Sequence, residues 1–326
     1  MSTGPTLAGI EDAAERLSRV AVRTPLIESP ALNDKTGGRI LLKPEILQRT
    51  GSFKFRGAYN FLSRIAPDTR AHGVVAYSSG NHAQGVAAAA QIFDVPATIV
   101  MPADAPQSKV DNTLGYGARV VAYDRQTESR EEIAADIAAA AGATLVPPFD
   151  HAWTIEGQGT VGLEIAAQCR GIEAVPEDVL VCCGGGGLTS GIAIALAASH
   201  PRARIHAVEP RDFDDAGRSL TAGRRLSNAP GVTSICDALL SPSIGELTFE
   251  AMHVHGVTGL SVSDEEVRSA MAYAWRVLKL VLEPGGAVAL AAILASKIYS
   301  RDQTIVAVLS GGNVDAAMFA ACIEVG

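Results

Sequence analysis

Cysteine is scarce in this chain, and charge of one sign is nowhere concentrated. The 326 residues include five cysteines, an odd number without the CxxC spacing that is typical of metal sites. Cys182 and Cys183 end an apolar run, which favours a packing role for both. The formal net charge of −8 argues against a nucleic acid or an anionic membrane as a partner.

Long apolar segments are also missing. The longest ones, 86–92 and 192–198, are shorter than a membrane span, and no apolar run follows a basic start at the N-terminus. We therefore expect a cytoplasmic protein that makes no membrane contact. Hydrophobic residues make up 48% of the chain, which is typical of a globular protein with a large core. A chain of 326 residues exceeds the usual size of a single core, so two domains are expected.

Short β-rich runs alternate with helical patterns, and this alternation predicts βαβ units and parallel sheets. A pair of prolines, Pro147 and Pro148, follows the first series and marks a boundary. The first series predicts strands at 74–77, 97–101, 119–123 and 144–146, with helices at 81–93, 108–116 and 128–141. The second series starts near Gln158 and predicts strands at 179–183, 204–209 and 304–309.

One lysine lies in a setting that suits covalent chemistry. Lys54 stands between two aromatic residues, Phe53 and Phe55. Apolar rings remove water from an amine, which lowers its pKa and leaves it free to attack a carbonyl. Most lysines are solvated surface groups, so Lys54 by itself would not establish an active site.

A run of glycines is the second informative feature. The predicted strand at 179–183 leads into Gly184, Gly185, Gly186 and Gly187, and an alanine-rich helix is predicted from Ile192. Consecutive glycines let backbone N–H groups turn inward, and the helix adds its positive end, so this loop suits a phosphate. No Gly-Lys-Ser/Thr follows, and the spacing is not that of a dinucleotide site, whereas a flexible turn is the plain alternative. A reactive lysine and a phosphate loop together indicate pyridoxal 5'-phosphate (PLP).

With four further segments, these features resemble the fold-type-II PLP enzymes of the serine/threonine dehydratase (ammonia-lyase) and serine racemase group. The segments occur in the family's order and cover nearly the whole chain: Thr50-Gly51-Ser52-Phe53-Lys54-Phe55-Arg56-Gly57-Ala58, Ser78-Ser79-Gly80-Asn81-His82-Ala83-Gln84-Gly85, Gly157-Gln158-Gly159-Thr160, the glycine loop, Glu283-Pro284 and Ser310-Gly311-Gly312-Asn313.

The resemblance implies a two-lobed α/β fold like that of the tryptophan synthase β chain. Each lobe would hold a mostly parallel sheet flanked by helices. Residues 1–72 and 147–326 would form a large PLP-binding domain, and residues 73–146 a small domain inserted in it. A homodimer is also implied, with a small amino acid as the substrate.

The resemblance also implies roles for single residues. Lys54 would form the Schiff base and remove the substrate's α-proton, while Ser79 would face the other side of the cofactor. Asn81 would hydrogen-bond the phenolic oxygen, and Ser310 would face the pyridine nitrogen. The implied cofactor-binding set is Phe53, Lys54, Asn81, Gly184, Gly185, Gly186, Gly187, Leu188, Glu283 and Ser310. The implied substrate-binding set is Ser78, Ser79, Asn81 and His82, with His82 in a supporting part.

The hydroxyl expected at the pyridine nitrogen bears on the reaction type. It holds that nitrogen less protonated than a carboxylate would, so the carbanion is less stabilised and a β-leaving group departs readily. We therefore expect an ammonia-lyase that dehydrates L-threonine or L-serine to a 2-oxo acid and ammonia, and Pro148-Phe149-Asp150 resembles the threonine dehydratase version of that segment.

Serine racemase and 3-hydroxyaspartate dehydratase are the two alternatives that stay open. The second needs a cation for the extra carboxylate, and Arg49 is one candidate for that cation. A non-catalytic binding homologue is disfavoured, because all the residues needed for the chemistry are present.

An acidic loop resembles the divalent-cation loop of the racemase-like members. Glu209 and Asp215 would supply carboxylates and Phe213 a backbone carbonyl. Hard oxygen ligands suit Mg²⁺, Mn²⁺ or Ca²⁺. The ordinary alternative for an acidic loop is a solvated surface. A cation here would be structural or allosteric, because the loop follows a strand remote from Lys54 in sequence.

Overall fold

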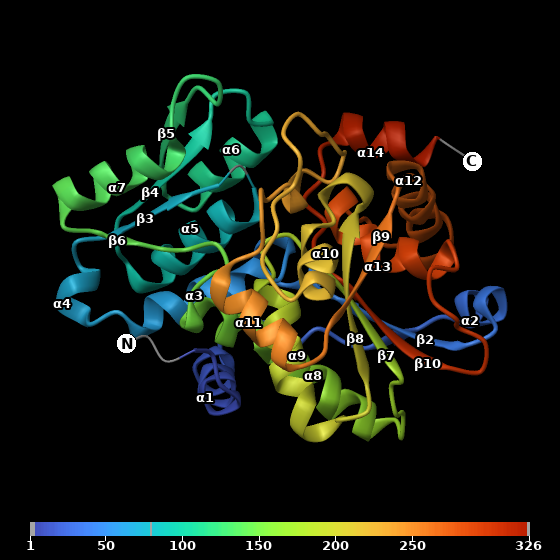
Figure 1. Cartoon of the computed structure of the whole chain (residues 1–326). Coiled ribbons are helices and arrows are strands. Elements are labelled where there is room, and N and C mark those ends of the chain that lie inside the picture. Colours follow the sequence, from blue (N-terminus) through green and yellow to red (C-terminus); the bar gives the residue numbers. More distant parts are fainter. Residues whose placement is uncertain (1–3, 79, 325–326) are drawn as a thin grey trace.

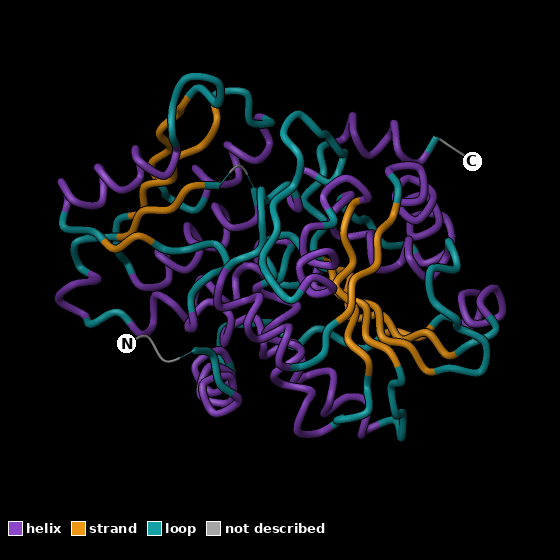
Figure 2. The backbone as a smooth tube through the Cα atoms, viewed as in Figure 1, coloured by secondary structure: helices purple, strands orange, loops and turns teal. Residues whose placement is uncertain are grey.

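The computed structural model describes residues 4–78 and 80–324, whose strands form two sheets (Figures 1 and 2). The large sheet has the strand order β1-β2-β10-β7-β8-β9. All its neighbouring strands are parallel except β1 and β2. Its strands are β1 (Ile27–Glu28), β2 (Arg39–Pro44), β7 (Asp178–Cys182), β8 (Arg204–Pro210), β9 (Thr258–Val262) and β10 (Thr304–Leu309).

The small sheet has the order β5-β4-β3-β6 and is parallel throughout. It contains β3 (Val74–Tyr77), β4 (Ala97–Pro102), β5 (Arg119–Tyr123) and β6 (Thr144–Leu145), joined by α5 (Asn81–Phe93), α6 (Gln107–Gly115) and α7 (Arg130–Ala141). These elements all fall within 73–146, and the predicted α/β class with parallel sheets is confirmed. The domain boundaries themselves stay a prediction.

The remaining helices surround the large sheet and the region between the two sheets (Figure 1). Strand β7 is buried along its whole length, as a continuous apolar run in a parallel sheet predicts. Within the described residues, no helix has the length and apolar character needed to cross a membrane. The helices are α1 (Leu7–Leu17), α2 (Pro30–Thr36), α3 (Lys54–Arg64), α4 (Pro67–Arg70), α8 (Ala152–Gly171), α9 (Gly187–Ser199), α10 (Asp215–Ala222), α11 (Glu246–Val254), α12 (Asp264–Tyr273), α13 (Pro284–Leu294) and α14 (Ala316–Ile323).

The start of the helix after the glycine run was predicted wrongly. Helix α9 begins at Gly187 rather than at Ile192. Gly186 has φ +90°, a left-handed conformation that glycine adopts readily, and its carbonyl accepts the Ser190 amide at 2.9 Å. The glycine run therefore supplies both the turn and the first helical residue. Strand β9 was not predicted at all, since it is short, half exposed and interrupted by Gly259.

Helices α8 and α9 cross at contacts that only glycine permits. A Cβ built on Gly191 would lie 2.6 Å from the Gly159 nitrogen and 2.6 Å from the Ile155 oxygen. Both are backbone atoms, so neither can move aside as a flexible side chain could. This close approach brings α9, and with it the glycine loop, against the helix that carries the Gly157–Thr160 segment.

We predict that Gly191→Ala lowers the free energy of unfolding by about 2 kcal/mol or more, because overpacking forces the two helices apart. Gly171→Ala is the matched control. A Cβ there would meet nothing within 4 Å, so alanine should be neutral or slightly stabilising. Urea unfolding of both variants measures the difference. Equal stabilities would show that α8 and α9 do not need this contact.

Candidate active site

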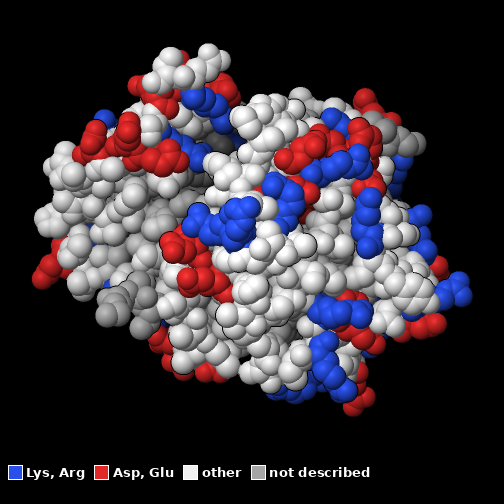
Figure 3. Space-filling view, in the orientation of Figure 1, with Lys and Arg blue, Asp and Glu red and all other residues white. Residues whose placement is uncertain are grey.

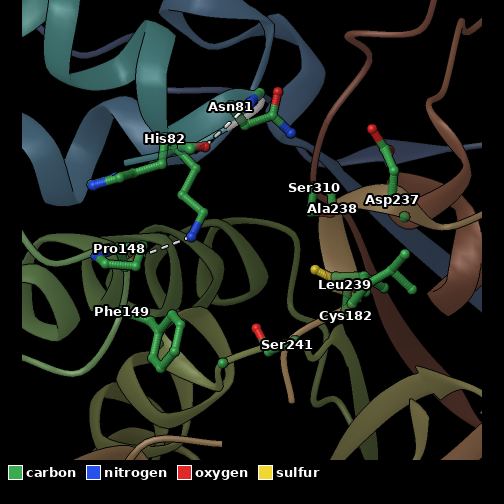
Figure 4. Close-up of a pocket in the computed structure, with 18 of the residues that line it drawn as sticks. Asn81, His82, Pro148, Phe149, Cys182, Asp237, Ala238, Leu239, Ser241 and Ser310 are labelled. Carbon is green, nitrogen blue, oxygen red and sulfur yellow. Dashed lines mark hydrogen bonds between the residues drawn. The ribbon is translucent and has the colours of Figure 1, made fainter. Parts of the chain in front are cut away.

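A cavity lies between the two sheets, and segments from both sides of the molecule line it (Figures 3 and 4). Its volume is about 150 Å³. In the close-up, Pro148 and Phe149 lie on one wall, opposite Cys182, Leu239 and Ser241. The lining includes Phe53, Lys54, Tyr77, Ser78, Gly80, Asn81, His82, Lys109, Arg130, Pro148, Phe149, Cys182, Gly184, Gly185, Gly186, Gly187, Leu188, Asp237, Ala238, Leu239, Leu240, Ser241, Glu283, Gly285 and Ser310. The cavity thus unites the described part of the predicted cofactor and substrate sets.

Lys54 is the first residue of α3, and its amine is enclosed by protein although the side chain keeps some surface open to the cavity. The amine donates to the Pro148 carbonyl at 2.9 Å and lies 5.2 Å from the centre of the Phe53 ring. Burial lowers the pKa of Lys54 to about 8. Nearby Cys182 and Glu283 act in the opposite direction, but their effect is smaller. At pH 7, roughly a tenth of the amine is therefore neutral and nucleophilic, far more than for an ordinary lysine.

This lowered pKa predicts a pH-dependent stability for the cofactor-free protein. Between pH 8 and the ordinary lysine pKa of 10.5, the unfolded chain binds a proton at Lys54 that the folded protein does not. The free energy of unfolding should therefore rise with pH in this window, by about 3 kcal/mol relative to Lys54→Met. Urea unfolding of both proteins from pH 7 to pH 10.5 tests this, and parallel curves would contradict it.

The glycine loop presents unsatisfied backbone amides to the cavity. Within the described residues, the N–H groups from Gly184 to Leu188 have no hydrogen-bond acceptor. The loop is fixed from outside, because the Gly185 carbonyl accepts from the Thr248 hydroxyl at 2.8 Å and from the Gly245 amide at 3.3 Å. Free amides at a helix N-terminus attract an anion.

The N-terminus of α5 is a second cluster of amides at the same cavity. Its first residues, Asn81 and His82, line the cavity, and the Gly80 amide donates to the Ser78 hydroxyl at 3.1 Å. This end suits a carboxylate for the same electrostatic reason. Ser79, predicted to bind substrate and to act as a second acid or base, lies outside the described residues.

Asn81 belongs to a buried hydrogen-bond network that joins four of the motif segments. Its amide nitrogen donates to Glu283 Oε1, and its oxygen accepts from Asn313 at 2.7 Å. Asn313 also donates to the Thr50 carbonyl at 2.7 Å. The network holds the start of α5 against the start of α13 and the segment that precedes Lys54.

Glu283 leaves one oxygen without a partner. Its Oε2 is buried and has no hydrogen-bond partner among the described residues. Burial raises the pKa of Glu283 to about 7, against the opposing effects of Lys109 and Asn81. A buried carboxyl oxygen without a partner is costly, and a hydrogen-bond donor on a bound ligand would relieve that cost.

Ser310 and Cys182 lie at the ends of the adjacent strands β10 and β7. Both side chains are buried and line the cavity. Burial raises the pKa of the Cys182 thiol to about 11, although a hydrogen bond with Ser310 opposes this. The thiol is therefore neutral, and no charged group of the described chain is bonded to the Ser310 hydroxyl.

His82 is a neutral residue in this structure. Burial lowers its pKa to about 3, and Lys54 acts in the same direction. Its Nε2 donates to the Val146 carbonyl at 3.0 Å, and its Nδ1 is buried without a partner among the described residues. His82 is therefore uncharged, and its Nδ1 is an acceptor without a partner among the described residues.

Several cavity residues were missed by sequence reasoning, and one proposed residue is elsewhere. Lys109, Arg130 and Asp237 line the cavity, yet no motif marks them. Arg49, considered for a second carboxylate, does not line it. Arg49 donates to the Val20 carbonyl at 2.5 Å and lies over the Phe55 ring.

The predicted cation loop contains two buried carboxylates. Glu209 accepts the Ala216 and Gly217 amides, each at 2.9 Å, and Asp215 accepts from Asn228 and Ile244. Burial raises the pKa of both groups. In residues 4–78 and 80–324, no three or more His, Cys, Asp or Glu side chains gather as a metal site would need. The set of Glu209, Phe213 and Asp215 stays a prediction.

The cavity residues fit PLP on features of this structure. The free amides from Gly184 to Leu188 suit its phosphate, and the Lys54 amine suits its aldehyde. Glu283 and His82 also line the cavity, and each has a buried polar atom without a partner among the described residues. A Cβ on Gly185 would lie 2.2 Å from the Phe149 ring, so the loop has no room for a side chain on that side.

Comparison with known proteins agrees with this geometry. The family described as pyridoxal-phosphate dependent enzyme matches residues 17–311. An L-threo-3-hydroxyaspartate ammonia-lyase from Pseudomonas sp is 42% identical over 96% of each chain. An L-threonine ammonia-lyase from Thermotoga maritima is 40% identical over 98% of this chain and 79% of its own. The structure of maize serine racemase has a TM-score of 0.92 at 34% identity, over 99% of this chain and 98% of that one. The chain therefore belongs to the family of pyridoxal-phosphate dependent enzymes, in its ammonia-lyase and racemase branch.

Proposed function

We propose that the protein is a PLP-dependent ammonia-lyase that converts L-threonine or L-serine to a 2-oxo acid and ammonia. The observation that carries the proposal is the placement of the Lys54 amine, with its lowered pKa, in one cavity with two helix N-termini. One terminus would hold a phosphate and the other a carboxylate. A small amino acid bound to PLP presents both groups.

In this proposal, Lys54 and the amides of Gly184, Gly185, Gly186, Gly187 and Leu188 hold the two ends of PLP. Asn81 would hydrogen-bond its phenolic oxygen, Ser310 would face its pyridine nitrogen, and Phe53 and Glu283 would complete the walls. PLP, when bound, supplies an electron sink for charge that develops at the substrate's α-carbon. The described chain contributes no carboxylate bonded to Ser310, which fits a moderate sink and an early loss of the β-hydroxyl.

The chain's own groups would position the substrate and move the protons. Ser78 and the amides at the start of α5 would bind the substrate carboxylate, with Asn81 beside them. The neutral form of the Lys54 amine would take the α-proton, which its pKa of about 8 permits near neutral pH. The hydrogen bond from the Lys54 amine to the Pro148 carbonyl holds the amine at the cavity wall. Ser79 is proposed as the proton donor on the opposite face, by resemblance alone.

3-Hydroxyaspartate is the second candidate substrate, favoured by the positive residues of the cavity. Lys109 and Arg130 both line it, and because Lys109 is paired with Asp237, Arg130 is the residue proposed to attract a second carboxylate. In the space-filling view, Lys and Arg side chains lie near the hollow between the two halves (Figure 3). The 3-hydroxyaspartate lyase from Pseudomonas sp, at 42% identity, supports the same choice. Serine racemase activity is the third, supported by the similarity to maize serine racemase.

The remaining features of the proposal rest on resemblance. We propose a homodimer located in the cytoplasm. A divalent cation at Glu209, Phe213 and Asp215 would act on structure, and no step of the reaction is assigned to it.

Product analysis tests the proposed function. L-threonine, L-serine and 3-hydroxyaspartate are each incubated with PLP-loaded protein, with Mg²⁺ or with a chelator, and 2-oxo acid and D-amino acid are both measured. Dominant 2-oxo acid from threonine or serine supports the first choice. Turnover confined to 3-hydroxyaspartate, or D-serine in comparable amount, would replace it with one of the alternatives. A chelator effect on any product would support the cation.

A further inference from the structure

We propose that Lys109 and Asp237 form a latch across the cavity and set the rate at which ligands leave it. The two residues are 128 positions apart and form a short ion pair between Lys109 Nζ and Asp237 Oδ2. Lys109 belongs to α6, beside the small sheet, whereas Asp237 belongs to the short helix η4 (Asp237–Leu239) on the large-sheet side. Among the described residues, this ion pair joins residues 73–146 to the rest of the chain, and no other does.

Lys109 lies directly at the proposed carboxylate site. A Cβ built on Gly80 would be 3.6 Å from Lys109 Nζ. The Lys109 side chain is only 8% exposed, so its charge needs a partner inside the protein. Movement of α6 would therefore carry this charge away from the start of α5.

Asp237 is held firmly by the large-sheet side. Leu239, in the same short helix, packs against the glycine loop and α13, since Cβ atoms built on Gly184 and Gly285 would lie 3.1 Å and 3.2 Å from it. Just before the helix, the Ser234 hydroxyl and the Ile235 amide donate to Asp264 of α12 at 2.6 Å and 3.1 Å. Figure 4 shows Asp237 and Asn81 on facing walls of the cavity.

The ion pair therefore connects the proposed carboxylate site at the start of α5 with η4, the short helix that packs against the glycine loop. While it is formed, the ion pair bridges these two walls, and in the proposed latch it opens before a ligand leaves. Asp237 is 45% exposed, so water and salt reach one partner and the pair should open often. These properties suit a latch better than a permanent structural bond.

The test measures the release of PLP from the loaded protein after dilution into buffer that contains a PLP scavenger. We expect Lys109→Gln and Asp237→Asn each to increase the rate of PLP release about threefold to fivefold. The double variant should release PLP at the same rate as each single variant. Added NaCl should speed release from the wild type and not from the variants. Arg125→Gln is the matched control, because it removes an exposed ion pair with Asp104 that stays within residues 73–146.

Effects that add in the double variant, or a change with Lys109→Gln alone, would overturn the latch, since Lys109 would then act on the ligand itself. The inference rests on the proposed function only for its choice of PLP as the ligand. Amide hydrogen exchange of the cofactor-free protein distinguishes a failure of the latch from a failure of the proposed function. If PLP does not bind but both variants expose α6 and η4 equally, the proposed function fails and the latch stands. Unchanged exchange in both variants would overturn the latch.

Discussion

Lys54→Ala is expected to abolish turnover and the visible absorbance of protein-bound PLP together. The Lys54 amine is the group that can both attach PLP and take the α-proton from the proposed substrate. Losing it should lower kcat by about 10⁴-fold or more. A 2-oxo acid assay with threonine, serine and 3-hydroxyaspartate, run beside an absorbance spectrum, measures both effects.

Lys35→Ala is the control for that experiment, because Lys35 is an exposed lysine near Tyr273 and far from the cavity residues. It should leave both activity and absorbance unchanged. Borohydride should bleach the wild-type protein by fixing PLP to Lys54. Persistent 2-oxo acid production by Lys54→Ala would contradict the role given to this residue. A wild-type protein that stays colourless with added PLP would contradict the whole catalytic proposal.

Arg56→Met is expected to cost more stability than any surface substitution. Arg56 is 1% exposed and forms ion pairs with Glu45 at 2.8 Å and with Glu164 at 2.7 Å. Lys43, also buried, pairs with Glu164 at 2.6 Å. Burial alone would raise the pKa of Glu45, but Arg56 and Lys43 hold it below its ordinary value. Removing Arg56 leaves a buried carboxylate without its main partner.

The free energy of unfolding should fall by about 3–5 kcal/mol for Arg56→Met, as is usual when one member of a buried pair is lost. The loss should be largest above the ordinary carboxyl pKa of 4.5 and should shrink at lower pH, where Glu45 takes up a proton. Urea unfolding at pH 7 and pH 4 measures both values. Arg39→Met is the control, since its pair with Glu28 is 37% exposed on each side and should cost under about 1 kcal/mol. If Arg56→Met and Arg39→Met lower the free energy of unfolding equally, then the buried position of Arg56 does not make its ion pairs more important for stability.

The fold class and several cavity residues could be predicted from sequence because their signals are local. The strand that ends at Cys182 and the glycines after it specify a turn whose amides are free, whatever packs around them. The rings of Phe53 and Phe55 adjoin Lys54 in the chain itself. The start of α9 was misplaced because glycine lowers helix propensity, whereas the packing of Gly191 against Gly159 makes those glycines helical.

Other features had no local signal. Lys109 and Asp237 each look like an ordinary surface charge in the sequence, as do Arg130 and Glu164. Arg49 is adjacent to the lysine motif and looked a better candidate for a second carboxylate, but its side chain turns to Val20 and away from the cavity.

The available chemistry follows from residues that are neighbours in the sequence: a lysine amine between two aromatic rings, a loop of free amides and a hydroxyl at the end of a strand. These depend on neighbours within a few positions, so the order of residues is enough. Which charges face one another depends on how distant parts of the chain pack. Arg56 meets Glu164 over 108 positions because helices α3 and α8 pack together, and Lys109 meets Asp237 over 128 because the two sides of the cavity come together there. Lys109, Arg130 and Asp237 line the cavity because of this packing, so the sequence did not show which charges surround a ligand there.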